Sequence, residues 1–153
     1  MIHYIKGDLL KSDCTTIAHQ CNCLSSMGAG IASIIRDVYK KAYNVDKYSK
    51  MTPDEKFGKY TAATIGKTTV VNLYGQYAYG RTKQQTDYEK LESALDLFFT
   101  DAKNNPKWNL EKFGVPYNMG CDLAGGDWNE VYAILERISK KHNVDIYTYH
   151  LEK

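Results

Sequence analysis

Segments with the pattern of β-strands alternate with segments that have the pattern of helices, and this alternation constrains the fold more than any other feature of the chain. Runs rich in β-branched and aromatic residues predict strands at residues 2–6, 15–18, 60–65, 68–74, 113–118 and 144–149. Apolar residues spaced three and four apart predict three helices, over residues 31–38, 87–102 and 128–138. Such alternation is typical of an α/β fold.

A tight turn and three polar stretches complete the outline. Gly66-Lys67 separates two predicted strands and suits a two-residue hairpin, so we expect one antiparallel pair in an otherwise parallel, mixed sheet. Residues 43–59, 77–85 and 120–127 are polar or glycine-rich and are predicted as loops. Because the chain has 153 residues and no repeat or linker, we expect a single domain over residues 1–153.

The charge balance and the cysteines argue against several classes of protein. Twenty Lys and Arg against eighteen Asp and Glu give a net charge of +2, which offers no basic surface for nucleic acid. The chain lacks an apolar run long enough to cross a membrane and the pattern of a secretory signal. Cys14, Cys21, Cys23 and Cys121 include no CxxC pair. We therefore expect free thiols in a cytoplasmic protein, with no metal site and no cofactor.

Two loops carry clustered small residues, and each follows a predicted strand and precedes a predicted helix. The first contains Gly28-Ala29-Gly30 and the second contains Gly125-Gly126-Asp127. A helix N-terminus presents unpaired N–H groups and a partial positive charge, and glycines let a phosphate approach that backbone. Neither loop has the full dinucleotide fingerprint or a P-loop sequence, so the spacing alone fits either an anion site or an ordinary tight connection.

Four motifs, taken in order, resemble those of the macro-domain family. They are Gly7-Asp8-Leu9, His19-Gln20-Cys21-Asn22-Cys23, Met27-Gly28-Ala29-Gly30-Ile31-Ala32 and Gly120-Cys121-Asp122-Leu123-Ala124-Gly125-Gly126-Asp127-Trp128. The last motif resembles the second ligand loop of the ADP-ribose 1''-phosphate phosphatase branch. The resemblance covers essentially the whole chain and implies a three-layer α/β/α fold that binds ADP-ribose in a cleft at the top of the sheet.

The resemblance also implies which residues hold the ligand. Asp8 would accept a hydrogen bond from the exocyclic amine of adenine, and Asn22 would hold hydroxyls of the distal ribose. Tyr149 and Tyr117 are candidates for stacking on adenine, although both also suit a core. The full set of expected ligand-binding residues is Gly7, Asp8, Leu9, Asn22, Met27, Gly28, Ala29, Gly30, Ile31, Gly120, Cys121, Asp122, Leu123, Ala124, Gly125, Gly126 and Tyr149.

His19 and Asp127 are the candidate catalytic residues that the resemblance implies. The near-neutral pKa of an ordinary histidine suits proton transfer or phosphate binding, but a histidine at a strand end also serves structural roles. Asp127-Trp128-Asn129-Glu130 has the form of a capping box, so Asp127 is a candidate helix cap as well as a candidate acid or base. The two roles of Asp127 are compatible, because a capping carboxylate keeps a second oxygen.

The expected function is therefore metal-independent removal of phosphate from ADP-ribose 1''-phosphate by a monomer. One alternative is a hydrolase that releases ADP-ribose from glutamate side chains, and another is a module that only binds ADP-ribose or a related nucleotide. The glutamate-specific branch uses a lysine before the middle helix and an aspartate in the second loop. Here the strand carries no lysine, Lys83 comes later, and Ala124 stands at the loop position. Asp122 replaces a family glycine and is expected to face solvent, because an inward carboxylate would repel a pyrophosphate.

Overall fold

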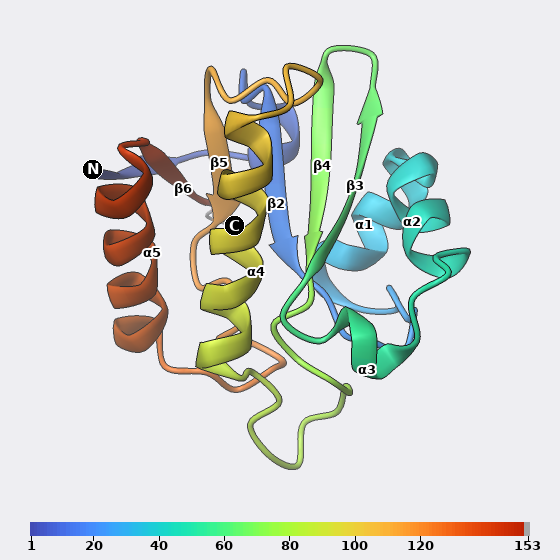
Figure 1. Cartoon of the computed structure of the whole chain (residues 1–153). Helices are drawn as coiled ribbons and strands as arrows, with labels where there is room; N and C mark the ends of the chain where they lie inside the picture. The colour runs from blue at the N-terminus through green and yellow to red at the C-terminus, as the bar shows by residue number, and fades with distance from the viewer. Residues whose placement is uncertain (152–153) are drawn as a thin grey trace.

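The computed structural model describes residues 1–151 and has a six-stranded sheet at its centre (Figure 1). The strands lie in the order β1-β6-β5-β2-β4-β3, and every neighbouring pair is parallel except β3 with β4. These two strands form the predicted hairpin, in which Gly66 adopts a φ of +62°. Their bounds are β1 Ile2–Lys6, β2 Thr16–Gln20, β3 Tyr60–Ile65, β4 Thr68–Leu73, β5 Phe113–Pro116 and β6 Ile146–His150. The predicted mixed, mostly parallel sheet is confirmed.

Helices cover both faces of this sheet. In Figure 1, α4 and α5 lie in front of the strands, and α1 and α2 lie on the other side. The bounds are α1 Gly30–Val38, α2 Lys40–Lys47, α3 Pro53–Lys56, α4 Tyr88–Lys103 and α5 Trp128–His142, with a 3₁₀ turn, η1, at Leu9–Lys11. The three-layer α/β/α arrangement is therefore confirmed.

Alternating side chains along β4 supply the apolar contacts for both outer layers. Val71 belongs to the core cluster that contains Phe98 of α4. The neighbouring Val70 packs on the opposite face with Ile35 of α1 and Ala42 of α2. Successive strand residues point to opposite faces, so an apolar run of this kind marks a strand that is buried on both sides.

Residues 43–59 are not the loop that the sequence predicted, and five α-helices occur among the described residues instead of three. Much of this stretch is helical, in α2 and α3. Thr52 accepts a hydrogen bond from the Glu55 N–H, Glu55 accepts one from the Thr52 N–H, and Pro53 occupies the first helical position. Polar composition and proline had suggested a loop, but proline at the first position of a capped helix is favourable.

The ends of four strands also differ from prediction, and β4 stops at Leu73, one residue before its expected end. β2 continues to Gln20, two residues beyond its expected end, whereas β5 ends at Pro116 and β6 begins at Ile146. The longer β2 brings His19 and Gln20 into register with Asn72 and Leu73 of β4. This extension matters because it places two polar side chains at the carboxyl edge of the sheet.

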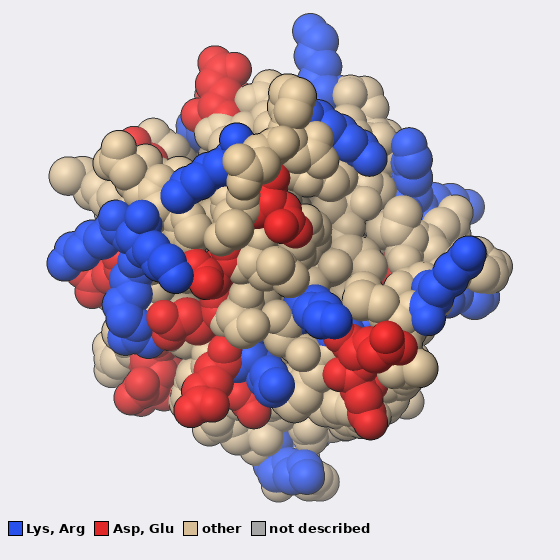
Figure 2. All heavy atoms as spheres, viewed as in Figure 1, with Lys and Arg blue, Asp and Glu red and all other residues tan. Residues whose placement is uncertain are grey.

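Charged side chains of both signs are interspersed on the face in Figure 2, as the small net charge leads one to expect. Arg137 of α5 and Glu92 of α4 form one such pair, with Nη2 2.6 Å from Oε1. No helix within residues 1–151 combines the length and the apolar character needed to cross a membrane.

Candidate functional site

A cavity of about 490 Å³ opens at the edge of the sheet where β2, β4 and β5 end. This volume lies within the usual range for a small-molecule site. In open α/β sheets, ligands bind at the carboxyl ends of the strands, where the connecting loops converge. The loops after these three strands form the wall, and the lining residues include His19, Gln20, Asn22, Gly28, Gly30, Gln76, Arg81, Tyr117, Gly120, Asp122 and Leu123.

The first glycine-rich loop holds its shape through Asn22. Its Oδ1 accepts the N–H groups of Leu24 and Ser26, and its Nδ2 donates to the Ser26 carbonyl. Ser25 between them has a left-handed φ of +58°. The amide side chain is thus mostly engaged in folding this loop, and one N–H remains for a ligand.

The same loop leads into an open helix N-terminus. Ala29 is the N-cap of α1, and no side chain caps the helix there. Gly30 has a φ of +60°, a conformation that glycine adopts without steric cost. Uncapped N–H groups in the wall of a cavity form a suitable site for an anion such as a phosphate.

The N-terminus of α5, in contrast, is closed by its own cap. Asp127 Oδ1 accepts the Asn129 N–H at 2.9 Å, whereas the Glu130 N–H bonds to the Asp127 carbonyl. The predicted N-cap is present, but its carboxylate does not make the bond to Glu130 that a capping box requires. Asp127 is exposed, and it is not among the residues that line the cavity.

His19 lines the cavity, but its ring is fully buried and neutral. Asn72 Nδ2 donates to the Ala42 carbonyl and to Thr61 Oγ1, so Asn72 Oδ1 faces the histidine. His19 Nε2 lies 2.7 Å from that oxygen and must donate to it, which leaves Nδ1 without a proton. Burial lowers the pKa of His19 to about 4. At neutral pH this side chain is a hydrogen-bond acceptor through Nδ1 rather than a cation.

Gln20 connects the loops that sequence reasoning treated separately. Its Nε2 donates to Gln76 Oε1 at 2.9 Å and to Thr86 Oγ1 at 2.8 Å. Thr86 in turn donates to the Gly120 carbonyl at 2.6 Å, which also accepts the Gly126 N–H. The end of β2 therefore fixes the loop after β4 and the second glycine-rich loop together.

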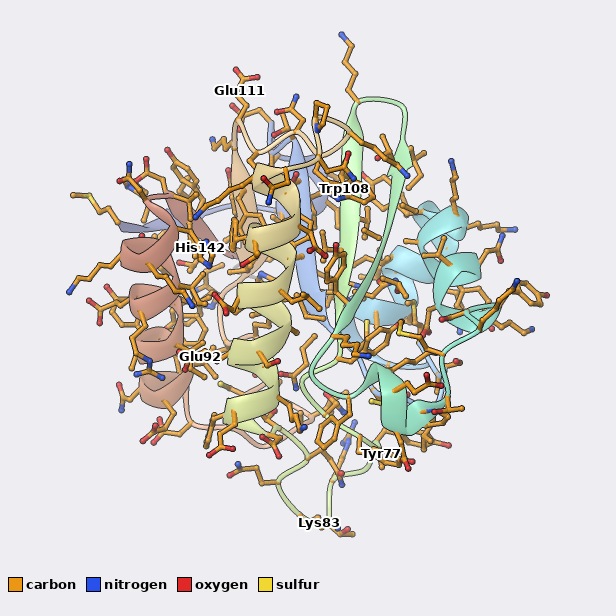
Figure 3. The ribbon with its side chains drawn as sticks, viewed as in Figure 1. Tyr77, Lys83, Glu92, Trp108, Glu111 and His142 are labelled. Carbon is orange, nitrogen blue, oxygen red and sulfur yellow. The ribbon has the colours of Figure 1, made fainter. Side chains whose placement is uncertain are left out.

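The loop after β4 contributes residues that the sequence analysis missed. Gln76, Tyr79, Gly80 and Arg81 line the cavity, although this stretch was predicted only as a polar connection. Lys83, the alternative lysine, lies instead at the outer tip of the loop (Figure 3) and does not line the cavity. The sequence did carry one signal, the run Tyr79-Gly80-Arg81, in which a glycine directly precedes a cationic residue in the loop between β4 and α4.

The residues expected around adenine lie outside the cavity wall. Asp8 caps η1, and its Oδ1 accepts the Leu10 N–H at 3.0 Å. Leu9 and Tyr149 are buried in one apolar cluster, where Tyr149 is 7% exposed. Gly7 approaches the Tyr149 ring. These residues form a group beside the cavity, and Tyr117, which does line the cavity, stacks on His150.

The remaining expected ligand residues divide into two groups. Those in the cavity wall are Asn22, Gly28, Ala29, Gly30, Ile31, Gly120, Asp122, Leu123 and Ala124. Asp122 is exposed and lies in the wall at the same time. Those outside the wall, besides the group near Asp8, are Met27, Cys121, Gly125 and Gly126.

All four cysteines have free thiols. Burial raises the pKa of Cys23 to about 11 and that of Cys121 to about 12, and it also raises the pKa of Cys21. Thiols with raised pKa values are poor nucleophiles at neutral pH, so cysteine chemistry does not suit this cavity. Within residues 1–151, no three His, Cys, Asp or Glu side chains gather in a way that could hold a metal ion.

Sequence relatives and solved structures resemble this chain over most of its length. A protein of Debaryomyces hansenii named ADP-ribose 1''-phosphate phosphatase is 41% identical over 164 residues, covering 80% of this chain and 92% of the relative. The human protein named ADP-ribose glycohydrolase OARD1 is 26% identical, covering 98% and 91% respectively. The macrodomain of Mycobacterium tuberculosis DarG superposes with a TM-score of 0.76 at 20% identity, covering 100% of this chain and 99% of that one. No protein-family model matches the chain.

Proposed function

Since this chain belongs to the macro-domain family, we propose that it binds ADP-ribose in the cavity at the end of β2 and hydrolyses ADP-ribose 1''-phosphate to ADP-ribose and phosphate. The observation that carries the proposal is the uncapped N-terminus of α1 in a cavity wall that Gly120 and Leu123 of the second glycine-rich loop also line. N–H groups at a helix N-terminus bind the oxygens of a pyrophosphate without needing a cationic side chain. The relative with 41% identity carries the name of this activity.

The reaction needs a water molecule, a base and a proton for the leaving oxygen. Water attacks the phosphorus, the bond between phosphorus and the 1''-oxygen breaks, and that oxygen takes a proton to become the hydroxyl of ADP-ribose. We assign the orientation of water to His19, because its unprotonated Nδ1 accepts a hydrogen bond. The buried ring of His19 already donates to Asn72, so we assign proton transfer to Asp127, whose carboxylate is exposed.

Asp127 fits this assignment because its second carboxylate oxygen takes no part in capping the helix. Only Oδ1 takes part in the hydrogen bond to Asn129. Asp127 follows the wall segment that contains Ala124, and its own N–H donates to the Tyr88 hydroxyl at 2.9 Å. The helix cap fixes the carboxylate, while the second oxygen stays available to a substrate that extends beyond the cavity.

The alternative hydrolase, which would release ADP-ribose from glutamate side chains, is favoured by the likeness to the human glycohydrolase. Two observations oppose it. Lys83 lies at the outer tip of its loop, and Ala124 occupies the position of the required aspartate. A module that only binds ADP-ribose would need no assignment for Asp127 at all.

Two parallel assays test the proposal. The protein is incubated with ADP-ribose 1''-phosphate, and released phosphate is measured. In the second assay it is incubated with protein that carries ADP-ribose on glutamate, and released ADP-ribose is measured. We expect phosphate release only. Release of ADP-ribose in the second assay would support the alternative hydrolase, and binding of ADP-ribose without any release would support the binding module.

A further inference from the structure

Arg81 stands out among the residues that line the cavity. Within the described wall it is the only side chain that is cationic at neutral pH, because His19 is neutral there. Asp122 is the carboxylate in the same wall. An anionic ligand therefore meets one cation and one like charge on this wall, and the cation must offset the repulsion from Asp122.

The guanidinium of Arg81 has no partner within the part of the chain that the structure describes. It takes part in no hydrogen bond, ion pair or ring contact with residues 1–151, and its side chain is exposed. The other arginines differ, since Arg137 pairs with Glu92 and Arg36 with Asp37. A planar guanidinium presents five donors that match the oxygens of a phosphate in a bidentate geometry.

The loop that carries Arg81 is held in place at both ends. Gln76 Nε2 donates to the Ala78 carbonyl at 2.7 Å, and the Gln85 N–H donates to the Ala124 carbonyl at 2.7 Å. Gly80, directly before the arginine, has a φ of +132°, a region that favours glycine. The backbone that presents Arg81 is thus tied to the second glycine-rich loop instead of hanging free.

We infer that Arg81 recognises the terminal phosphate and thereby selects ADP-ribose 1''-phosphate over ADP-ribose. This inference rests on the proposed function. The two ligands share the pyrophosphate, for which the N-terminus of α1 already supplies donors. They differ in a phosphate monoester that carries a charge of about −1.5 to −2 near pH 7. The pyrophosphate that both ligands share does not require Arg81, so this cationic donor of the cavity wall is available to the terminal phosphate.

The test compares two ligands and two variants by calorimetry. The ligands are ADP-ribose and an ADP-ribose analogue with a non-hydrolysable phosphonomethyl group at the 1'' position. Arg81→Gln removes the cation from the cavity wall, and Lys83→Gln makes the same charge change at the tip of the same loop. We expect Arg81→Gln to weaken binding of the phosphonate ligand about 10- to 150-fold, as loss of a charge-assisted hydrogen bond predicts. Binding of ADP-ribose should weaken less than about 3-fold. Lys83→Gln should change neither affinity by more than about 3-fold.

Equal weakening of both ligands by Arg81→Gln, or no weakening of either, would overturn the inference. So would an identical effect of Lys83→Gln, because the effect would then be one of general charge. Phosphate release by the unaltered protein is measured separately. If no phosphate is released but Arg81→Gln still weakens the phosphonate ligand selectively, the proposed reaction fails and the inference stands. If phosphate is released and selectivity is unchanged, the inference alone fails.

Discussion

Lys56 and Asp46 form an ion pair in the interior, with Nζ 2.9 Å from Oδ1 and the two side chains 3% and 1% exposed. The same ammonium donates to Ser25 Oγ at 2.9 Å, and the Tyr74 hydroxyl donates to Asp46 Oδ1 at 2.7 Å. Ser25 is the residue with a left-handed φ in the first glycine-rich loop. The ion pair therefore joins α2 and α3 to the loop that precedes the open end of α1.

We predict that Lys56→Met lowers the free energy of unfolding by about 3–5 kcal/mol, because it leaves the buried carboxylate of Asp46 without its counter-ion. Chemical denaturation monitored by circular dichroism measures this loss. The affinity for ADP-ribose should also fall, since Ser25 Oγ loses the hydrogen bond that the Lys56 ammonium donates.

The double variant Asp46→Asn/Lys56→Met provides the control. With the charge removed as well, much of the lost stability should return, while the bond to Ser25 stays broken. Recovered stability together with weak binding of ADP-ribose would show that the ion pair positions the loop. A Lys56→Met protein as stable as the original would contradict the prediction.

A second prediction concerns acid. Burial lowers the folded-state pKa of His19 to about 4, below the value near 6.5 of an exposed histidine, so the unfolded chain binds the extra proton first. The contribution of His19 to stability is complete above about pH 6.5 and is lost progressively as the pH falls toward 4. Between pH 6.5 and 5 the loss amounts to about 2 kcal/mol.

His19→Gln isolates this effect, because a glutamine amide can still donate to Asn72 and does not titrate. Denaturant midpoints measured for both proteins from pH 7 to pH 4.5 should converge as the pH falls. Parallel curves for the two proteins would mean that His19 does not titrate as its burial implies.

Much of the fold follows from the sequence because periodicity reports which faces are buried. Val70 and Val71 mark a strand with two apolar faces, and Leu91, Leu95 and Phe98 mark the inner face of α4. Residues 43–59 gave no such signal, since α2 and α3 bury a charged pair there instead of an apolar stripe. The capping box at Thr52, with Pro53 after it, was the readable sign of a helix.

The candidate site follows from the sequence only in part. Motif order points to the two glycine-rich loops, but it does not reveal that Gln20, through Gln76 and Thr86, joins the second of them to the loop after β4. Such a bond joins residues that are distant in the chain, and a single sequence contains no distance information. Nor does the sequence reveal that Asn72 fixes which ring nitrogen of His19 carries the proton, because that depends on strand register.

Two glycines offer a matched pair of substitutions. A Cβ on Gly28 would lie 3.5 Å from Ser26 Oγ, an ordinary contact, whereas a Cβ on Gly126 would lie 2.6 Å from the Gly120 carbonyl oxygen. We expect Gly28→Ala to leave the melting temperature unchanged and to weaken the binding of ADP-ribose, because the added methyl group lies in the cavity wall. Gly126→Ala should cost about 1–3 kcal/mol of stability. Thermal denaturation with and without ADP-ribose separates the two effects, and equal stability of both variants would contradict the steric argument.

Asp8→Asn tests the contact with adenine that the resemblance to macro domains implies, for a residue that lies outside the cavity wall. An asparagine keeps the hydrogen bond to the Leu10 N–H through its oxygen, so stability should change little. Its amide would present a donor to the donor amine of adenine, and we expect ADP-ribose to bind about 10- to 150-fold more weakly. Calorimetry measures the loss. Unchanged affinity would place adenine elsewhere, with Tyr117 in the cavity wall as the first candidate.

The last prediction separates the two roles of Asp127, as helix cap and as acid or base. Asparagine caps a helix about as well as aspartate, so Asp127→Asn should keep the bond to the Asn129 N–H and the melting temperature of the protein. It cannot transfer a proton as a carboxylate does, and groups of this kind supply about 100- to 10,000-fold in rate. We expect phosphate release to fall by that factor while ADP-ribose binds within a few-fold of the original affinity.

Asp127→Ala serves as the control, because it removes the cap as well and should lose about 1 kcal/mol of stability in addition. If Asp127→Asn keeps full activity, the aspartate acts only as a cap. Proton transfer must then come from another group, and the Nδ1 of His19 is the remaining acceptor in the cavity that we have assigned.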